Sequence, residues 1–204
     1  MDPKTAPMQF VPTLPPEEAA RADLYGVLAR LFYAPPDAAL LKDLAAAGEL
    51  EAEDDAVARA WRELARAAAA ADPAAVREEY ETAFIGVGKA PVTLYVSAYS
   101  VRYTNEMPLA ELRGALAALG LARRSEATEP EDHIAALCEV MRYLIAEQKA
   151  PLEDQKRFFE RWIWPAADPL CGAIRKSGQM TFYPAAARLL LEVCTLDHMA
   201  FELI

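Results

Sequence analysis

The sequence predicts an all-α protein, a single-domain helical bundle of roughly nine helices. Three observations lead to this fold class. The chain has 204 residues, of which 54% are hydrophobic and 25% charged, so it can bury one sizeable core. Apolar residues recur at helical spacing along most of the chain, and strand-like alternation is rare. Glycine is sparse, and the many alanines favour helix.

Residues 1–15 carry four prolines and no helical period, so we expect a proline-rich extended arm before a helical domain at 16–204. Proline, glycine and aspartate then separate four helices in the first half. The expected helices cover residues 16–34, 37–48, 54–71 and 72–85. Their inward faces are expected to carry Leu24, Leu28, Leu31, Phe32, Leu40, Leu41, Leu44, Val57, Trp61, Leu64, Val76, Tyr80 and Phe84.

Residues 86–99 differ in composition, because two glycines and a proline interrupt a run of bulky side chains. The Gly86-x-Gly88 spacing lacks a third glycine, a following Lys-Ser/Thr pair and a preceding strand, so no phosphate-binding loop is predicted. We expect a long loop that either caps the core or faces a ligand.

The second half predicts helices at 108–119, from about 130 to before Pro151, and at 154–164. Pro165 and Pro169 are expected to interrupt the next helix, which Gly178 ends, and a last helix starts near Tyr183. A polar linker precedes the helix near residue 130, so residues 122–130 are a candidate hinge.

The net charge of −10 argues against nucleic-acid binding, which needs a basic face. It is compatible with a basic peptide partner, and it is also an ordinary means of staying soluble. Three distant cysteines and two histidines predict buried free thiols and no metal site or cofactor. The sequence shows neither a membrane-length apolar run nor a secretory signal, so we expect a cytoplasmic protein without stable membrane insertion.

The segment Glu129-Pro130-Glu131-Asp132-His133 precedes a strongly amphipathic run. Thr128 and Glu131 have the spacing of a capping box, so Asp132 and His133 are expected in the first helical turn. Two interpretations remain open at this point. The acids complement the helix dipole while His133 packs, or the segment is a polar recognition site on a hinge. An Asp–His acid–base pair is disfavoured, because neighbouring side chains on a helix point about 100° apart.

Glu129, Pro130, Asp132 and His133, followed by Leu137 and Met141, resemble the E-P-x-D-H-x-x-x-L-x-x-x-M signature of the TorD/DmsD family. A second segment, 80–86, resembles the family's Y-x-x-L-F-x-G pattern, with Ala83 in place of leucine. Pro91, Tyr95, Ser97 and Tyr99 follow it in the family's order, while Val96 departs from the pattern. A weaker likeness covers Gln155 to Pro165.

The resemblance implies an all-helical cytoplasmic chaperone and no enzyme. Such proteins bind the twin-arginine signal peptide and the body of a molybdopterin oxidoreductase, and they hold back export until the cofactor is loaded. Carried over residue by residue, Asp132 and His133 would contact the signal peptide or client, and Glu129 and Pro130 would shape the hinge. The neighbouring groove would be lined by Tyr80, Phe84, Tyr95, Ser97 and Tyr99.

The chemistry of such a ligand suits the segment without the family. Carboxylates can engage guanidinium groups through paired hydrogen bonds, and Glu129, Glu131 and Asp132 supply them. An apolar groove would take the hydrophobic part of the peptide as a helix. The alternative is a helical adaptor or regulatory protein that binds a different peptide. The sequence is compatible with a monomer or with a domain-swapped dimer.

Overall fold

The computed structural model describes residues 13–47, 55–86, 90–100, 108–123, 129–178 and 180–204. Within these ranges it contains ten α-helices, one π-helix and no strand, which confirms the all-α fold class. Residues 1–12 of the predicted arm and 124–128 of the candidate hinge lie outside the described ranges, so both stay predictions.

The first half follows the predicted order: α1 (Pro16–Tyr33), α2 (Ala38–Ala46), α3 (Ala56–Ala70) and α4 (Pro73–Tyr80). Aspartates start three of these helices, because Asp37, Asp55 and Asp72 each accept a hydrogen bond from the backbone N–H three residues on. The fourth predicted helix continues past Tyr80 as a π-helical turn, η1 (Glu81–Ile85). It ends at Gly86, whose φ of 63° favours glycine.

The second half contains α5 (Ser97–Ser100), α6 (Pro108–Ala118), α7 (Ile134–Ala146), α8 (Leu152–Trp162), α9 (Trp164–Lys176) and α10 (Tyr183–Phe201). The one-turn helix α5 falls where only a loop was expected. The predicted interruption at Pro169 is wrong, because α9 runs through it. A proline inside a helix removes one hydrogen bond. Four residues around it, Ala166, Ala167, Leu170 and Cys171, are fully buried and hold the helix in place.

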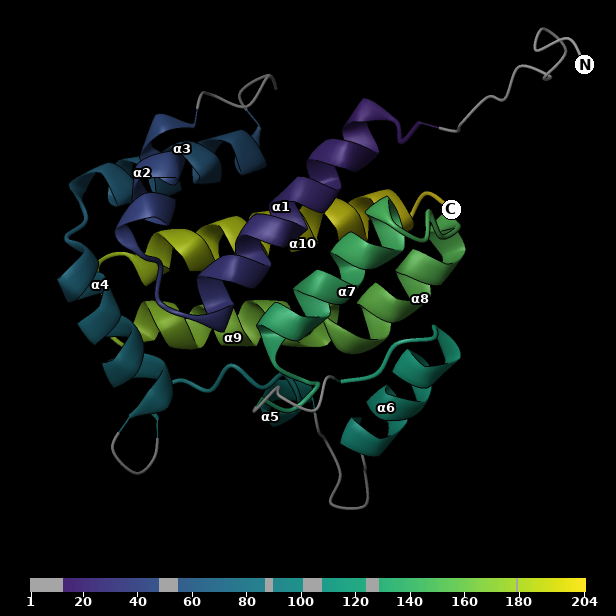
Figure 1. Cartoon of the computed structure of the whole chain (residues 1–204). Helices are drawn as coiled ribbons and strands as arrows, with labels where there is room; N and C mark the ends of the chain where they lie inside the picture. Colours follow the sequence, from purple (N-terminus) through teal and green to yellow (C-terminus); the bar gives the residue numbers. More distant parts are fainter. Residues whose placement is uncertain (1–12, 48–54, 87–89, 101–107, 124–128, 179) are drawn as a thin grey trace, which may run out of the picture.

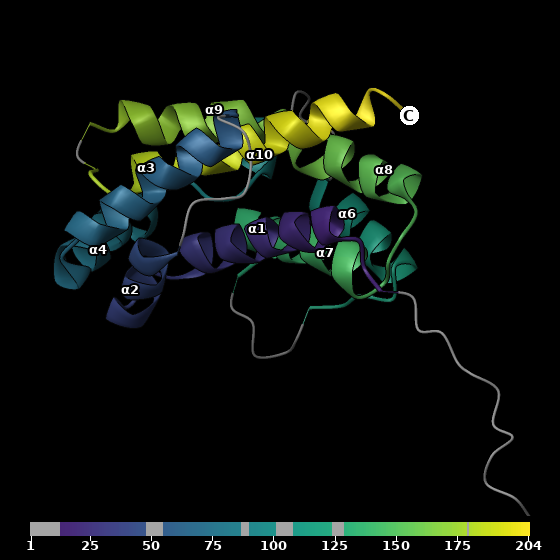
Figure 2. The same ribbon diagram turned by 90° about the horizontal axis from the view of Figure 1, so that it is seen from above.

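The helices form two layers, which Figure 2 shows from above. α1 packs along α7 in one layer, and α9 and α10 pack together in the other, with α3 against α10 (Figure 1). The core lies between the layers, and its largest fully buried side chains are Tyr25, Phe32, Phe159, Phe182 and Tyr183. The predicted apolar stripe of α7 faces this core, with Ile134, Leu137, Cys138, Met141 and Ile145 all buried.

The start of α7 differs from the prediction. The helix begins at Ile134, so Asp132 and His133 precede it, and Nδ1 of His133 caps it by accepting from the Ala135 N–H at 3.2 Å. The cause is a short antiparallel pairing with the loop before α5, which keeps this backbone extended. Val96 donates to the Asp132 carbonyl and Ile134 donates to the Leu94 carbonyl, both at 2.9 Å. The N-cap of α7 is His133, so the helix does not start from the predicted capping box, and Thr128 lies outside the described residues.

A polar network near the ends of α1 and α10 crosses the otherwise apolar interior. The Arg21 guanidinium donates to Asp197 and to Gln155, both at 2.8 Å, and the Tyr25 hydroxyl donates to the other Asp197 oxygen at 2.7 Å. Burial raises the pKa of Asp197, and the charge of Arg21 opposes that rise. The network ties α1, α8 and α10 together, because each helix supplies one of its charged or amide groups.

Replacing Asp197 by alanine is expected to lower the free energy of unfolding by about 3 kcal/mol, since removing one member of a buried ion pair leaves the other charge uncompensated. Urea unfolding measures the loss. The matched control is Glu18→Gln, because Glu18 also contacts Arg21 but its side chain is 28% exposed. We expect the control to cost less than about 1 kcal/mol. Equal losses in the two variants would contradict the special role of the buried partner.

The cap at His133 predicts a pH dependence of stability. Burial lowers the pKa of His133 below its ordinary 6.5, and Nδ1 can accept from Ala135 only while the ring is neutral. The unfolded chain therefore takes up this proton at a higher pH than the folded chain. The contribution of His133 is complete above pH 6.5 and is lost as the pH falls through the lower folded-state pKa.

Asparagine caps helices well and does not titrate, so His133→Asn is expected to flatten the stability curve on the acid side of neutrality. Urea unfolding of both proteins at a series of pH values between about 7 and 5 checks this. The same slope in the wild type and in the variant would refute the assignment.

Candidate functional site

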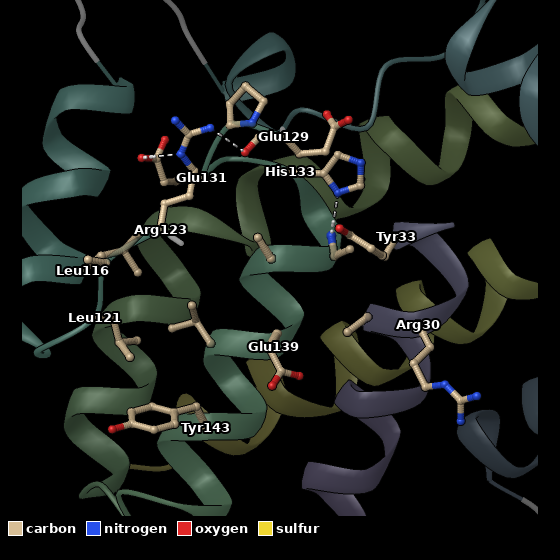
Figure 3. Close-up of a pocket in the computed structure, with 16 residues that line it drawn as sticks. Arg30, Tyr33, Leu116, Leu121, Arg123, Glu129, Glu131, His133, Glu139 and Tyr143 are labelled. Atoms are coloured by element: carbon tan, nitrogen blue, oxygen red, sulfur yellow. Dashed lines mark hydrogen bonds and ion pairs between the residues drawn. The ribbon is translucent and has the colours of Figure 1, made fainter. Parts of the chain in front are cut away.

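A groove with a volume of about 530 Å³ lies where α1, α6 and α7 meet the segment 129–133 (Figure 3). Its wall is mostly apolar, apart from Arg30 on α1 and Glu139 on α7, and it carries Glu129 and Glu131 at the end where α7 begins. The lining comprises Ala29, Arg30, Tyr33, Leu116, Leu121, Ala122, Arg123, Glu129, Pro130, Glu131, His133, Ala135, Ala136, Glu139, Val140 and Tyr143.

The segment 129–133 is held from behind by the loop that pairs with it. The Tyr95 hydroxyl donates to the Glu129 carboxylate, and the Ser97 hydroxyl donates to Asp132. The edge-to-face contact of the Tyr95 and His133 rings, with centroids 5.6 Å apart, completes the junction. The hydrogen bond to Glu129, followed by burial, raises the pKa of Tyr95 to about 12. Six of the nine predicted site residues therefore lie in or against one junction: Tyr95, Ser97, Glu129, Pro130, Asp132 and His133.

Asp132 and His133 occupy different places although they are adjacent in sequence. His133 lines the groove, while Asp132 is 6% exposed and is not among the lining residues. Because Nδ1 of His133 accepts from Ala135, its Nε2–H is the polar group that the ring can offer to a ligand. Asp132 instead accepts from Ser97, so its carboxylate positions the loop rather than facing the groove.

Tyr80 and Phe84 lie behind the groove, in an aromatic cluster with Tyr183. The Tyr80 ring lies 5.1 Å from Phe84 and 5.6 Å from Tyr183, and its hydroxyl donates to the Phe32 carbonyl at 3.0 Å. Burial, followed by the nearby Glu129 carboxylate, raises the pKa of Tyr80 to about 12. Neither of these side chains lines the groove.

Tyr99 also lies outside the groove lining. Its hydroxyl donates to the Thr93 carbonyl at 2.9 Å, which closes the loop before α5 on itself. Burial raises the pKa of Tyr99. Tyr99 therefore helps to hold the shape of the loop that carries Tyr95 and Ser97.

Most of the groove wall was missed by sequence reasoning. One signal was available on α7, where Ala136, Glu139, Val140 and Tyr143 fall at offsets 0, 3, 4 and 7 beside the core stripe. This second, half-apolar stripe forms the long wall of the groove. The contributions of α1 and α6, such as Tyr33 and Leu116, had no local signal, because they depend on which helices pack together.

The described residues show no reactive thiol, metal site or membrane-spanning helix. All three cysteines are free and buried, and burial raises the pKa of Cys138 far above its ordinary value. The described residues contain no group of three His, Cys, Asp or Glu side chains arranged to hold a metal ion. Among the described helices, none is both long enough and apolar enough to span a bilayer.

The groove is therefore suited to a ligand that has an apolar part and a cationic end. Its apolar wall suits a hydrophobic segment, and Glu129 and Glu131 at one end suit a cation. Arg113 donates to Glu131 at 3.0 Å and holds the pKa of that carboxyl below its usual range, so the carboxylate is charged at neutral pH.

Comparison with known proteins identifies the family of the chain. The family model described as nitrate reductase delta subunit matches residues 50–171, well over half of the chain. A curated relative, "Chaperone protein TorD" from Photobacterium profundum, is 30% identical over 129 residues. That alignment covers 56% of this chain and 58% of the relative, so the chain spans little more than half the length of that protein. The chain belongs to the TorD/DmsD family of chaperones.

Proposed function

We propose that this protein is a chaperone for a molybdopterin oxidoreductase, which binds the twin-arginine signal peptide and the apo form of that enzyme. It would assist cofactor insertion and hold back export until the enzyme is mature. Membership in a chaperone family supports the general activity. The observation that carries the peptide-binding part is the groove, because it joins carboxylates to an apolar wall in one continuous surface.

The proposed ligand matches the groove in charge and shape. A twin-arginine signal peptide joins a cationic head to an apolar stretch, and a helical apolar stretch packs into a hydrophobic groove by its side chains. Leu116, Leu121 and Val140 supply apolar surface for that stretch, and Glu129 and Glu131 lie at one end for the arginines. The chain's net charge of −10 favours encounter with a cationic partner.

Other functions fit less well. Membership in a chaperone family supports the expectation that the chain is not an enzyme. A helical adaptor for a different peptide would use the same groove, and it differs from the proposal in lacking a preference for arginine. A chaperone that acts before export works in the cytoplasm, so we place the protein there as part of the proposal.

Calorimetric titration of the full chain with a synthetic peptide tests the proposal. The peptide carries two adjacent arginines followed by an apolar stretch, and we expect a dissociation constant in the micromolar range or tighter. Replacing both arginines by lysine is expected to weaken binding about tenfold, because lysine lacks the fork that engages a carboxylate with two hydrogen bonds. Equal binding of the two peptides would favour the adaptor, and no binding of either would refute the signal-peptide proposal.

Variants separate contact from positioning within the junction. His133→Ala removes a group that lines the groove, and Asp132→Ala removes the anchor of Ser97, so both are expected to weaken binding of the arginine peptide several-fold. Ser97→Ala removes the other partner of the Ser97–Asp132 hydrogen bond. If Asp132 acts through this bond, Ser97→Ala should reproduce much of the Asp132→Ala effect. Unfolding curves establish that each variant is folded. Unchanged affinity in both the Asp132 and His133 variants would exclude this junction.

A further inference from the structure

Glu131 is a groove residue with an unusual environment. Its side chain is 10% exposed, and its Oε1 atom accepts from Arg113 at 3.0 Å. Its Oε2 atom is buried and has no hydrogen-bond partner among the described residues. Buried carboxylate oxygens are normally satisfied, because leaving one without a donor is costly. Glu131 therefore has one carboxylate oxygen that is hydrogen-bonded and one that lacks a donor, which points to a cationic ligand.

Arg123 also lies near this carboxylate, at a distance longer than a hydrogen bond. Figure 3 shows the Arg123 side chain extending along the groove wall, with its guanidinium between Glu129 and Glu131. Its Nε atom is 3.8 Å from Oε1 of Glu131, beyond hydrogen-bond distance, and its guanidinium donates to the Glu129 carbonyl at 3.4 Å. The side chain is 40% exposed, so the ion pair is of the weak, solvent-screened kind.

We propose that Arg123 occupies, in the unliganded protein, the place that a guanidinium of the bound peptide takes up against Glu131. This inference rests on the proposed function and assigns two roles within its site. Glu131 is the acceptor for the arginine of the partner, and Arg123 is a resident placeholder that the partner displaces. The incoming guanidinium uses Oε2, the oxygen that Arg123 leaves unmet.

The two arginines at Glu131 have different roles because they approach from different sides. Arg113 belongs to α6, does not line the groove, and makes the short hydrogen bond that orients the carboxylate. Arg123 lines the groove and makes the long contact. The ligand's cation therefore enters at the position of Arg123, because Arg113 already occupies the other side of the carboxylate.

The exchange also discriminates between ligands. An apolar peptide without arginine would leave Arg123 in place and gain nothing at Glu131. At Glu131, a peptide with arginine replaces a 3.8 Å ion-pair contact by a charge-assisted pair of hydrogen bonds, which are the stronger kind. In the free protein, Arg123 thus balances the charge of Glu131. A ligand displaces Arg123 only if it brings a guanidinium of its own.

Calorimetry with the same twin-arginine peptide, on the full chain, tests the placeholder. Arg123→Gln removes the competitor, and we expect the peptide to bind about two- to fivefold more tightly, the range that an exposed ion pair represents. Glu131→Gln is expected to weaken binding by about tenfold, the equivalent of one charge-assisted hydrogen bond. In the Glu131→Gln background, Arg123→Gln should bring no further gain, because the two residues then no longer act on the same group.

Arg188→Gln is the matched control for net charge. Arg188 pairs with Glu192 on α10, is 46% exposed and lies outside the groove lining, so its loss changes the charge of the chain equally. Unchanged or weaker binding in Arg123→Gln overturns the placeholder while leaving peptide binding intact. Equal tightening in Arg188→Gln also overturns it, because the gain is then a general charge effect. Absence of peptide binding in every protein overturns the proposed function and the placeholder together.

Discussion

The groove depends on the pairing of two short segments that are distant in sequence, 94–96 and 132–134. Two backbone hydrogen bonds hold them, and they keep the backbone of His133 itself extended, so α7 begins at Ile134. The same pairing places the Tyr95 hydroxyl at Glu129 and the Ser97 hydroxyl at Asp132. One local constraint therefore sets the helix start, the cap and the polar end of the groove at once.

The polar network around Arg21 and the groove lie towards opposite ends of α1. At one end of α1, Arg21 reaches Asp197 and Gln155 and fixes the helix against α8 and α10. At the other end, Ala29 and Tyr33 form part of the groove wall. Because α1 is anchored on both its α7 and its α10 side, the groove has one rigid wall against which a mobile ligand can be ordered.

Sequence reasoning predicted the helices well where local chemistry decides them. The helix starts at Asp37 and Asp72 and the buried stripe of α7 are properties of neighbouring residues, and they were predicted with nearly correct bounds. Pro169 was misread, because the burial of the residues around it outweighs its local cost. The start of α7 was also misread, since the pairing that sets it involves Tyr95, which lies 38 residues before His133.

The candidate site was predictable only in part for the same reason. The motif residues Glu129, Pro130 and His133 do line the groove, yet motif matching could not distinguish them from Asp132, which faces inward. Nor could it find the walls, because Tyr33 and Leu116 meet α7 only through tertiary packing. Charges at Arg123 and Glu131 were visible in the sequence, but their distance and the unmet oxygen between them exist only in the folded chain.

The long-range partners of α1 also have a consequence for biosynthesis. This helix leaves the ribosome well before α7, which covers it and follows about a hundred residues later, and Asp197 lies 176 residues beyond Arg21. Until then the faces that carry Leu28, Leu31 and Phe32 have nothing of their own to cover them. The groove is lined by residues between Ala29 and Tyr143, so the nascent chain cannot form it before α7 has been made.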